Sequence, residues 1–157
     1  MTTGYSRSVS GSTATMTVTN ALSQQTTIVS NLTTGRPTSV TDALGRATSY
    51  QYDSSGRLTR ATADEGNSVG YTYDSRGNVT ETRLREKGDT GDTGDDIVTT
   101  ASFPSTCTNV LTCNKPTSVT DARGNVTDFA YDSTHGGVTR VTGPTPGTSG
   151  NRPQTRY

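Results

Sequence analysis

A tyrosine–aspartate–glycine pattern recurs in this chain at a constant distance. The segment YQYDSSG (50–56) returns 21 residues later as YTYDSRG (71–77). A catalytic motif has no need to recur within one small domain, whereas a structural unit that is stacked many times does. The pattern therefore predicts a repeat architecture, and it constrains the fold more than any other feature of the sequence.

Glycines mark the ends of the repeated units. They occupy positions 35, 45, 56, 66, 77 and 88, and most follow an acidic residue by two or three positions. An aspartate that opens a four-residue turn and a glycine that closes it at positive φ are typical of a type I turn in a bulged hairpin. The predicted turn residues are Asp42, Gly45, Asp53, Gly56, Asp74, Gly77, Asp121, Gly124 and Asp132.

The segments between the turns have the pattern of strands. RATSYQY (46–52) and NSVGYTY (67–73) are rich in β-branched and aromatic residues, and their apolar residues fall on alternate positions. Strand–turn–strand units at this short spacing predict an all-β fold, an antiparallel meander that forms a twisted sheet. No window has a convincing 3.6-residue helical period, so helices are not expected.

The composition excludes a thick hydrophobic core. Only 27% of the residues are apolar and tryptophan is absent, whereas a typical globular domain is about 45–50% apolar with glycine included. Acidic and basic residues balance at 14 each, so no electrostatic field that would collect nucleic acid is expected. No segment approaches the roughly 20 apolar residues of a membrane span.

A longer echo divides the chain. PTSVTDALGRATSYQYD (37–53) returns as PTSVTDARGNVTDFAYD (116–132). The expected organisation is a meander over 1–85, an acidic, glycine-rich interruption with a cysteine pair over 86–114, and a second meander over 115–157. Tyr157 follows Gly150 at the distance at which Tyr52 follows Gly45, so the second meander is expected to be truncated within a repeat. The open edges of such a sheet are expected to pair with neighbouring repeats.

These repeats resemble the Rhs/YD-repeat family. The resemblance is carried by YDSSGR (52–57), by its variants at 73–78 and 131–136, and by TDALGR (41–46). Members of the family resemble long β-ribbons that spiral into a hollow shell. This shell encloses a toxic polypeptide in bacterial polymorphic toxins and insecticidal toxin complexes, and a related barrel in teneurins takes part in adhesion at the cell surface. The resemblance implies a structural casing or surface module without an active site. The twisted or spiralling sheet is expected to be a segment of a shell or a fibre subunit.

Two segments could carry chemistry outside the repeats. Cys107 and Cys113 enclose five residues, which suits neither a zinc site nor a Cys-x-x-Cys redox pair. A local disulfide in an oxidising, extracellular setting is favoured over two free thiols. GDTGDTGDD (88–96) lacks the ligand spacing of known calcium loops, so a solvated loop is favoured over a weak cation site. No metal or cofactor is expected.

The remaining candidates have a structural interpretation beside a functional one. His135 is the only histidine and occupies a repeat turn, so a turn residue is favoured over a catalytic base. The repeat aromatics could form a cross-strand ladder that replaces a core, which is favoured, or a surface on which sugars stack. These aromatics are Tyr50, Tyr52, Tyr71, Tyr73, Phe129 and Tyr131.

The sequence therefore predicts a non-enzymatic structural repeat unit of an extracellular bacterial assembly, secreted or on the cell surface. Its expected partners are other repeats of the same or neighbouring chains, with an enclosed toxin or surface glycans as further possibilities. The alternative is a carbohydrate- or receptor-binding adhesion module.

Overall fold

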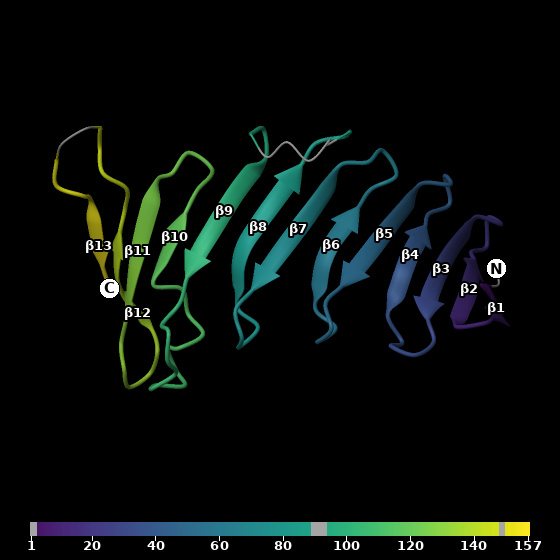
Figure 1. Ribbon diagram of the computed structural model, residues 1–157, viewed down its shortest axis with the longest axis horizontal. Coiled ribbons are helices and arrows are strands. Elements are labelled where there is room, and N and C mark those ends of the chain that lie inside the picture. The colour runs from purple at the N-terminus through teal and green to yellow at the C-terminus, as the bar shows by residue number, and fades with distance from the viewer. Residues whose placement is uncertain (1–2, 89–93, 148–149) are drawn as a thin grey trace. The chain divides into compact units, whose positions relative to one another are not determined.

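The computed structural model describes residues 3–88, 94–147 and 150–157 (Figure 1). Residues 89–93 of the predicted acidic loop lie outside this part of the chain, which contains strands and no helix. The strands are β1 (Gly4–Ser10), β2 (Thr13–Thr19), β3 (Gln25–Asn31), β4 (Pro37–Thr41), β5 (Ala47–Tyr52), β6 (Leu58–Thr62), β7 (Ser68–Tyr73), β8 (Val79–Arg85), β9 (Ile97–Ser102), β10 (Ser118–Thr120), β11 (Val126–Tyr131), β12 (Val138–Thr142) and β13 (Gln154–Arg156).

The strands follow one another in the sheet in their order along the chain. Each strand pair whose register is described is antiparallel. Short connections can join only antiparallel neighbours, because a parallel pair needs a long crossover. The predicted all-β antiparallel meander is confirmed.

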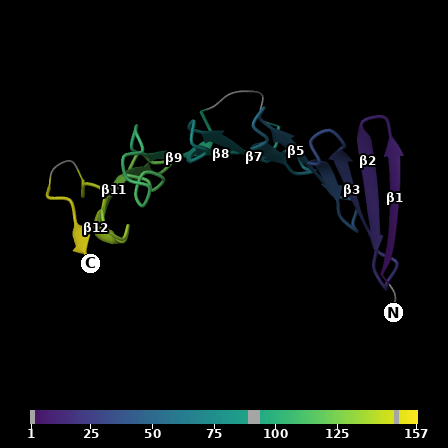
Figure 2. The ribbon, with the colours of Figure 1, turned by 90° about the horizontal axis from the view of Figure 1, so that it is seen from below.

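The chain forms two compact units. The first comprises Met1–Gly70 with Arg85–Asp95, and the second comprises Tyr71–Leu84 with Asp96–Tyr157. In the first unit, β1, β2, β3 and β5 lie in one layer (Figure 2), and among the described residues no second layer covers either face of this unit.

The strand register of the first unit gathers most of the larger apolar side chains on one face, although Arg7 and Thr48 share that face and Val29 lies on the other. Tyr5 lies opposite Val18, and Met16 opposite Ile28. Since side chains alternate between the faces of a strand, one face, here called the apolar face, carries Tyr5, Met16, Val18, Ile28, Val40, Tyr50, Ala61 and Val69. The other face, here called the hydroxyl face, carries Ser8, Thr15, Ser39, Ser49, Thr62 and Ser68.

Neither unit contains a conventional core. Among the described residues, Cys113 is the one apolar side chain that is fully buried, whereas Tyr5 is 73% exposed. All seven residues of β1 are exposed. With so little apolar burial, the hydrogen-bonded ladders, the turns and the cross-strand pairs must stabilise the sheet.

The segment predicted to interrupt the meander contains a strand. β9 lies within 86–114 and pairs with both β8 and β10. IVTTAS is β-branched like the other strands, but it lacks the tyrosine–aspartate pattern by which they were identified. The connection 103–117 between β9 and β10 contains no strand.

The repeat turns have the predicted geometry. In the β4–β5 turn, Gly45 N donates to Asp42 O at 3.0 Å and Asp42 N donates to Arg46 O at 2.9 Å. The φ angles are 82° at Gly45, 78° at Gly56, 89° at Gly77 and 80° at Gly124. These are left-handed values that glycine adopts without strain.

Gly56→Ala is expected to destabilise the protein more than Gly45→Ala. Alanine at either position costs about 1–2 kcal/mol in left-handed backbone strain. A β-carbon at Gly56 would also overlap the Arg36 guanidinium, whereas one at Gly45 meets nothing within 4 Å. Displacing Arg36 breaks its hydrogen bond to Gly56 O and adds about 1 kcal/mol. Urea denaturation of the two variants measures the difference, and equal losses would contradict this account.

Candidate functional site

In five repeat turns, the opening aspartate binds backbone N–H groups of its own turn. One carboxylate oxygen of Asp53 accepts a hydrogen bond from Arg57 N at 2.8 Å, and the other accepts one from Arg57 Nε at 2.7 Å. Asp42 binds Arg46 N at 3.0 Å and Arg46 Nε at 2.8 Å. Asp74, Asp121 and Asp132 also accept backbone N–H groups of their own turns.

These hydrogen bonds favour the ionised carboxylates. The backbone N–H and then the side chain of Arg57 lower the pKa of Asp53. The side chain of Arg46 lowers the pKa of Asp42, and the pKa values of Asp74, Asp121 and Asp132 are lowered by their turn partners in the same way. The turn aspartates are thus ionised hydrogen-bond acceptors at neutral pH.

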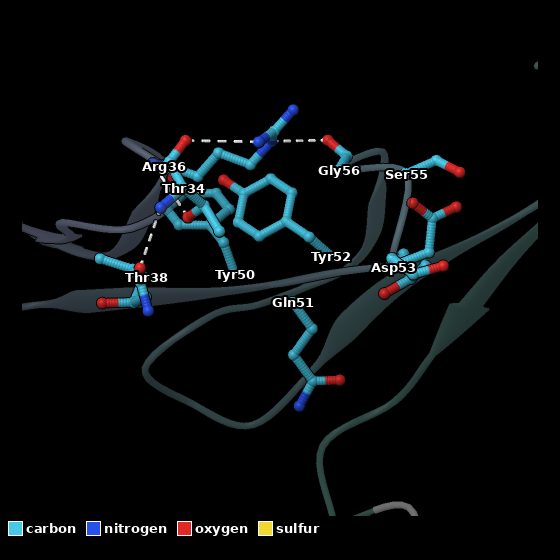
Figure 3. A pocket seen from close by; sticks show the side chains of 12 residues that line it. Thr34, Arg36, Thr38, Tyr50, Gln51, Tyr52, Asp53, Ser55 and Gly56 are labelled. Carbon is cyan, nitrogen blue, oxygen red and sulfur yellow. Dashed lines mark hydrogen bonds between the residues drawn. The ribbon is translucent and has the colours of Figure 1, made fainter. Parts of the chain in front are cut away.

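A basic residue in the first unit links two successive turns that lie at the same end of the strands. Arg36 Nε donates to Gly56 O at 2.7 Å, and its guanidinium lies 5.8 Å from the centre of the Tyr52 ring (Figure 3). Arg36 Nη1 also donates to Thr34 O at 3.3 Å in its own turn. Arg36 therefore joins the β3–β4 turn to the β5–β6 turn by a hydrogen bond and a cation–π contact.

The second unit contains the same arrangement with lysine. Lys115 Nζ donates to Gly136 O and lies 5.4 Å from the centre of the Tyr131 ring. Arg36 and Lys115 are 79 residues apart, and each precedes the PTSVTD segment of the longer echo. We call this arrangement of cation, tyrosine and turn carbonyl the cation clamp. No local sequence pattern predicts this clamp, although the two cations stand at equivalent positions of the echo.

The repeat aromatics are all half-buried. Tyr50 lies opposite Ala61, and Phe129 lies opposite Val141. Tyr52 and Tyr131 follow register shifts in β5 and β11, and Tyr71 and Tyr73 lie in β7. Where the register is described, each aromatic residue lies opposite an aliphatic residue. Equivalent tyrosines are 21 residues apart and therefore lie two strands apart, so they are not cross-strand neighbours. The choice between a ladder and a sugar-binding surface thus depends on the space around each ring.

Two of these rings, those of Tyr50 and Tyr52, line a hollow of about 610 Å³ in the first unit. Tyr50 and Tyr52 extend to one side of β5, whereas Gln51 extends to the other (Figure 3). Arg36, Asp53 and hydroxyl-bearing residues such as Thr38 and Ser55 also line the hollow.

The connection between β9 and β10, which contains the two cysteines, contacts two turns of the second unit. Cys107 and Cys113 are joined in a disulfide. From the β7–β8 turn, Arg76 donates to Pro104 O at 2.5 Å and to Ser105 O at 3.2 Å. Asn109 Nδ2 donates to Ser133 O of the β11–β12 turn at 2.7 Å.

His135 contributes to a turn. Its Nδ1 accepts a hydrogen bond from Gly137 N at 3.1 Å, and its exposed ring lies 3.5 Å from Asp132 Oδ1. The same oxygen of Asp132 accepts hydrogen bonds from the N–H and hydroxyl of Thr134. Within the described ranges, no group of three or more metal-ligating side chains occurs, and no helix could span a membrane.

Comparison with known proteins places this geometry in a family. The family model for the RHS Repeat matches residues 33–68 and 52–90. These residues belong to the RHS repeat family. The matched RHS repeats include β4 to β8 and the cation clamp of Arg36.

Solved structures also resemble the chain. "Crystal Structure of TcdB2-TccC3-Cdc42" matches at 17% identity with a TM-score of 0.48, over 89% of this chain and 9% of that chain. The TcdB2-TccC3 structure without its hypervariable C-terminal region matches at 18% identity with a TM-score of 0.45, over 80% of this chain and 8% of that chain. This chain thus spans less than a tenth of each. A search of curated proteins gives no match.

Replacing Arg36 tests the cation clamp. Arg36→Ala is expected to lower the free energy of unfolding by about 1–2 kcal/mol, because a half-buried hydrogen bond and a cation–π contact are lost. Arg36→Lys is expected to lose less, since Lys115 makes the same two contacts in the second unit. Urea denaturation followed by circular dichroism measures both losses. Arg7→Ala on the exposed β1 strand is the control, and a lysine variant as unstable as the alanine variant would contradict the clamp.

The protein is expected to lose stability when the pH falls below about 4. The pKa of Asp53 lies below its ordinary value of 3.8 in the folded state. Its stabilising effect is therefore complete above the unfolded-state pKa and is lost as the pH falls through the folded-state pKa. Asp53→Asn keeps an acceptor oxygen for Arg57 N, as Asn20 does for Gln24 N in the β2–β3 turn, but removes this titration. Its loss of stability between pH 7 and pH 3, from urea denaturation, should be smaller than that of the unaltered protein, and an identical loss would exclude Asp53 as a contributor.

Proposed function

We propose that the chain is a non-catalytic structural segment of RHS repeats in an extracellular bacterial assembly, either a toxin-enclosing shell or a fibre-like surface structure. The observation that supports this proposal most directly is the structure of the recurrent turn. The aspartate of the turn binds the turn's own backbone. The cation clamp joins this turn to the neighbouring turn at the same end of the strands. The conspicuous polar groups of the repeat therefore serve to build the sheet.

The protonation state of the turn aspartates supports a structural role. A general acid needs a pKa raised toward the working pH. The pKa values of Asp42, Asp53, Asp74, Asp121 and Asp132 are shifted in the opposite direction. Both oxygens of Asp53 are already occupied by Arg57, so this carboxylate is committed to the turn.

The disulfide supports an extracellular location. A bond between Cys107 and Cys113 persists in oxidising surroundings and is reduced in most cytosols. Disulfides of this kind are typical of secreted and cell-surface proteins.

The edge strand β1 supports assembly with further repeats. Its partner within the described residues is β2, and the seven-residue ladder between them has no register shift. A long, regular and exposed edge presents N–H and C=O groups to an added strand. Arg7 is the one charged residue of β1. We propose that a strand of a neighbouring repeat pairs with this edge.

Sedimentation velocity over a range of concentrations tests the assembly. The protein is expected to form larger species as its concentration rises, and the double variant Tyr5→Lys/Val9→Lys is expected to remain monomeric because charges on an edge strand oppose pairing. Leu22→Lys/Leu44→Lys adds the same charge at two exposed turn positions and is the matched control. A protein that is monomeric at every concentration, or a control that dissociates it equally, would contradict edge pairing.

A further inference from the structure

The segment between the two cysteines, here called the disulfide loop (107–113), is closed on itself. Cys113 N donates to Asn109 O at 2.9 Å, and Leu111 N donates to Asn109 Oδ1 at 2.9 Å. The chain from Asn109 to Cys113 therefore makes a single turn, and the disulfide ties the end of that turn back to Cys107. A covalent ring of this size leaves the enclosed backbone few conformations.

One arginine of the β7–β8 turn binds both ends of this ring. Arg76 donates to Pro104 O and Ser105 O, which precede Cys107, and its Nη2 also lies 3.4 Å from Cys113 O. These acceptors are close together in space because the disulfide joins the two ends of the loop. The contacts of Arg76 therefore depend on a closed ring.

The other side of the loop contacts the β11–β12 turn, which lies at the same end of the strands (Figure 1). Asn109 Nδ2 donates to Ser133 O at 2.7 Å. Leu111 O approaches Gly136 so closely that a β-carbon at this glycine would lie 2.7 Å from it. The disulfide loop thus connects two turns that are separated by two strands, β9 and β10.

The two cysteines differ in their access to solvent. Cys113 is 2% exposed, whereas Cys107 is an exposed residue. Thiol–disulfide exchange begins when a thiolate attacks one sulfur and the other sulfur leaves, and the choice between them depends on access. An external thiolate therefore attacks Cys107 Sγ, and Cys113 is the leaving group.

We propose that Cys107 is a site of exchange with small cytosolic thiols such as glutathione, and that the disulfide is a reducible fastener of this end of the second unit. The glutathione thiolate bonds to Cys107 Sγ as the S–S bond breaks, and its electron pair leaves on Cys113, which takes up a proton. A second glutathione thiolate attacks the sulfur of the bound glutathione, and Cys107 leaves. Oxidised glutathione is released, so two thiols supply the two electrons that reduce the protein.

Reduction is expected to free both turns from the loop. An open chain regains the conformations that the ring excluded, so the acceptors of Arg76 separate and the turn that begins at Asn109 frays. This inference rests on the proposed extracellular location, where the disulfide forms. It adds that transfer into a reducing compartment loosens the sheet at this point.

Hydrogen exchange of the full chain, measured by mass spectrometry with and without millimolar reduced glutathione at neutral pH, tests the fastener. The thiol has one target, because Cys107 and Cys113 are the two cysteines of the chain. Backbone amides of 109–113, 74–78 and 132–137 are expected to exchange about tenfold faster after reduction, since closing a short ring is worth at least that factor. The β4–β5 turn (42–46) is the internal control and should not change.

A variant and a trapping step identify the chemistry. Cys107→Ser/Cys113→Ser without thiol should exchange like the reduced protein and should not respond to glutathione, and circular dichroism checks that it is folded. Brief treatment with glutathione followed by N-ethylmaleimide should leave glutathione on Cys107 and the alkyl group on Cys113.

The outcomes separate this inference from the proposed location. Free thiols before treatment, in protein made in an oxidising compartment, would overturn both. An intact disulfide that resists glutathione, unchanged exchange of both turns after reduction, or glutathione trapped on Cys113 would overturn the fastener alone.

Discussion

The carboxylate that binds its own turn is the interaction on which this sheet depends. In a chain with 27% apolar residues, burial cannot select one strand register over another, since a hydrophobic core is what usually fixes it. The turn does so instead. Asp53 fixes the chain direction on leaving the turn by binding Arg57 N, while Gly56 at a φ of 78° supplies the left-handed residue that the turn requires. Asn20 takes the same acceptor role in the β2–β3 turn, where its Oδ1 accepts hydrogen bonds from Leu22 N and Gln24 N, so an oxygen at this position matters more than a negative charge.

Local turns alone would leave neighbouring hairpins connected only through their shared strand. The cation clamp adds a second connection at the ends of the strands. Arg36 contacts its own turn and the next turn at the same end. In the second unit, Lys115 contacts a turn carbonyl, that of Gly136, and the Tyr131 ring with a different cation. The two cases share a positive charge, a tyrosine face and a turn carbonyl, so the contact depends on charge and reach more than on the shape of the guanidinium. The repeat tyrosine thereby acts both as a cross-strand neighbour and as a platform for the cation.

The sequence predicted those features that depend on local pattern. The positions of the turns, the alternation of the strands, the positive φ of Gly45 and Gly56, and the antiparallel meander all follow from residues close together in the chain. The strand β9 was missed because it lacks the tyrosine–aspartate pattern, and the clamp was missed because a cation before Pro37 or Pro116 has no local distinguishing feature. The hollow beside Tyr50 and Tyr52 depends on how side chains from separate turns are placed, which no short window contains.

Departures from the repeat are where residues become free for roles other than building the sheet. At five turns an aspartate stands at the opening position and its carboxylate is bound by the backbone of the turn, as at Asp53. In the β6–β7 turn, Ala63 opens the turn and closes it with backbone groups alone, and the adjoining residues Asp64 and Glu65 are exposed. The connection 103–117 departs in another way, since a disulfide-closed loop replaces a short turn and binds the turns on either side of it. In a protein whose regular positions are committed to architecture, such irregular positions are the ones at which specificity for a partner can arise without disturbing the sheet.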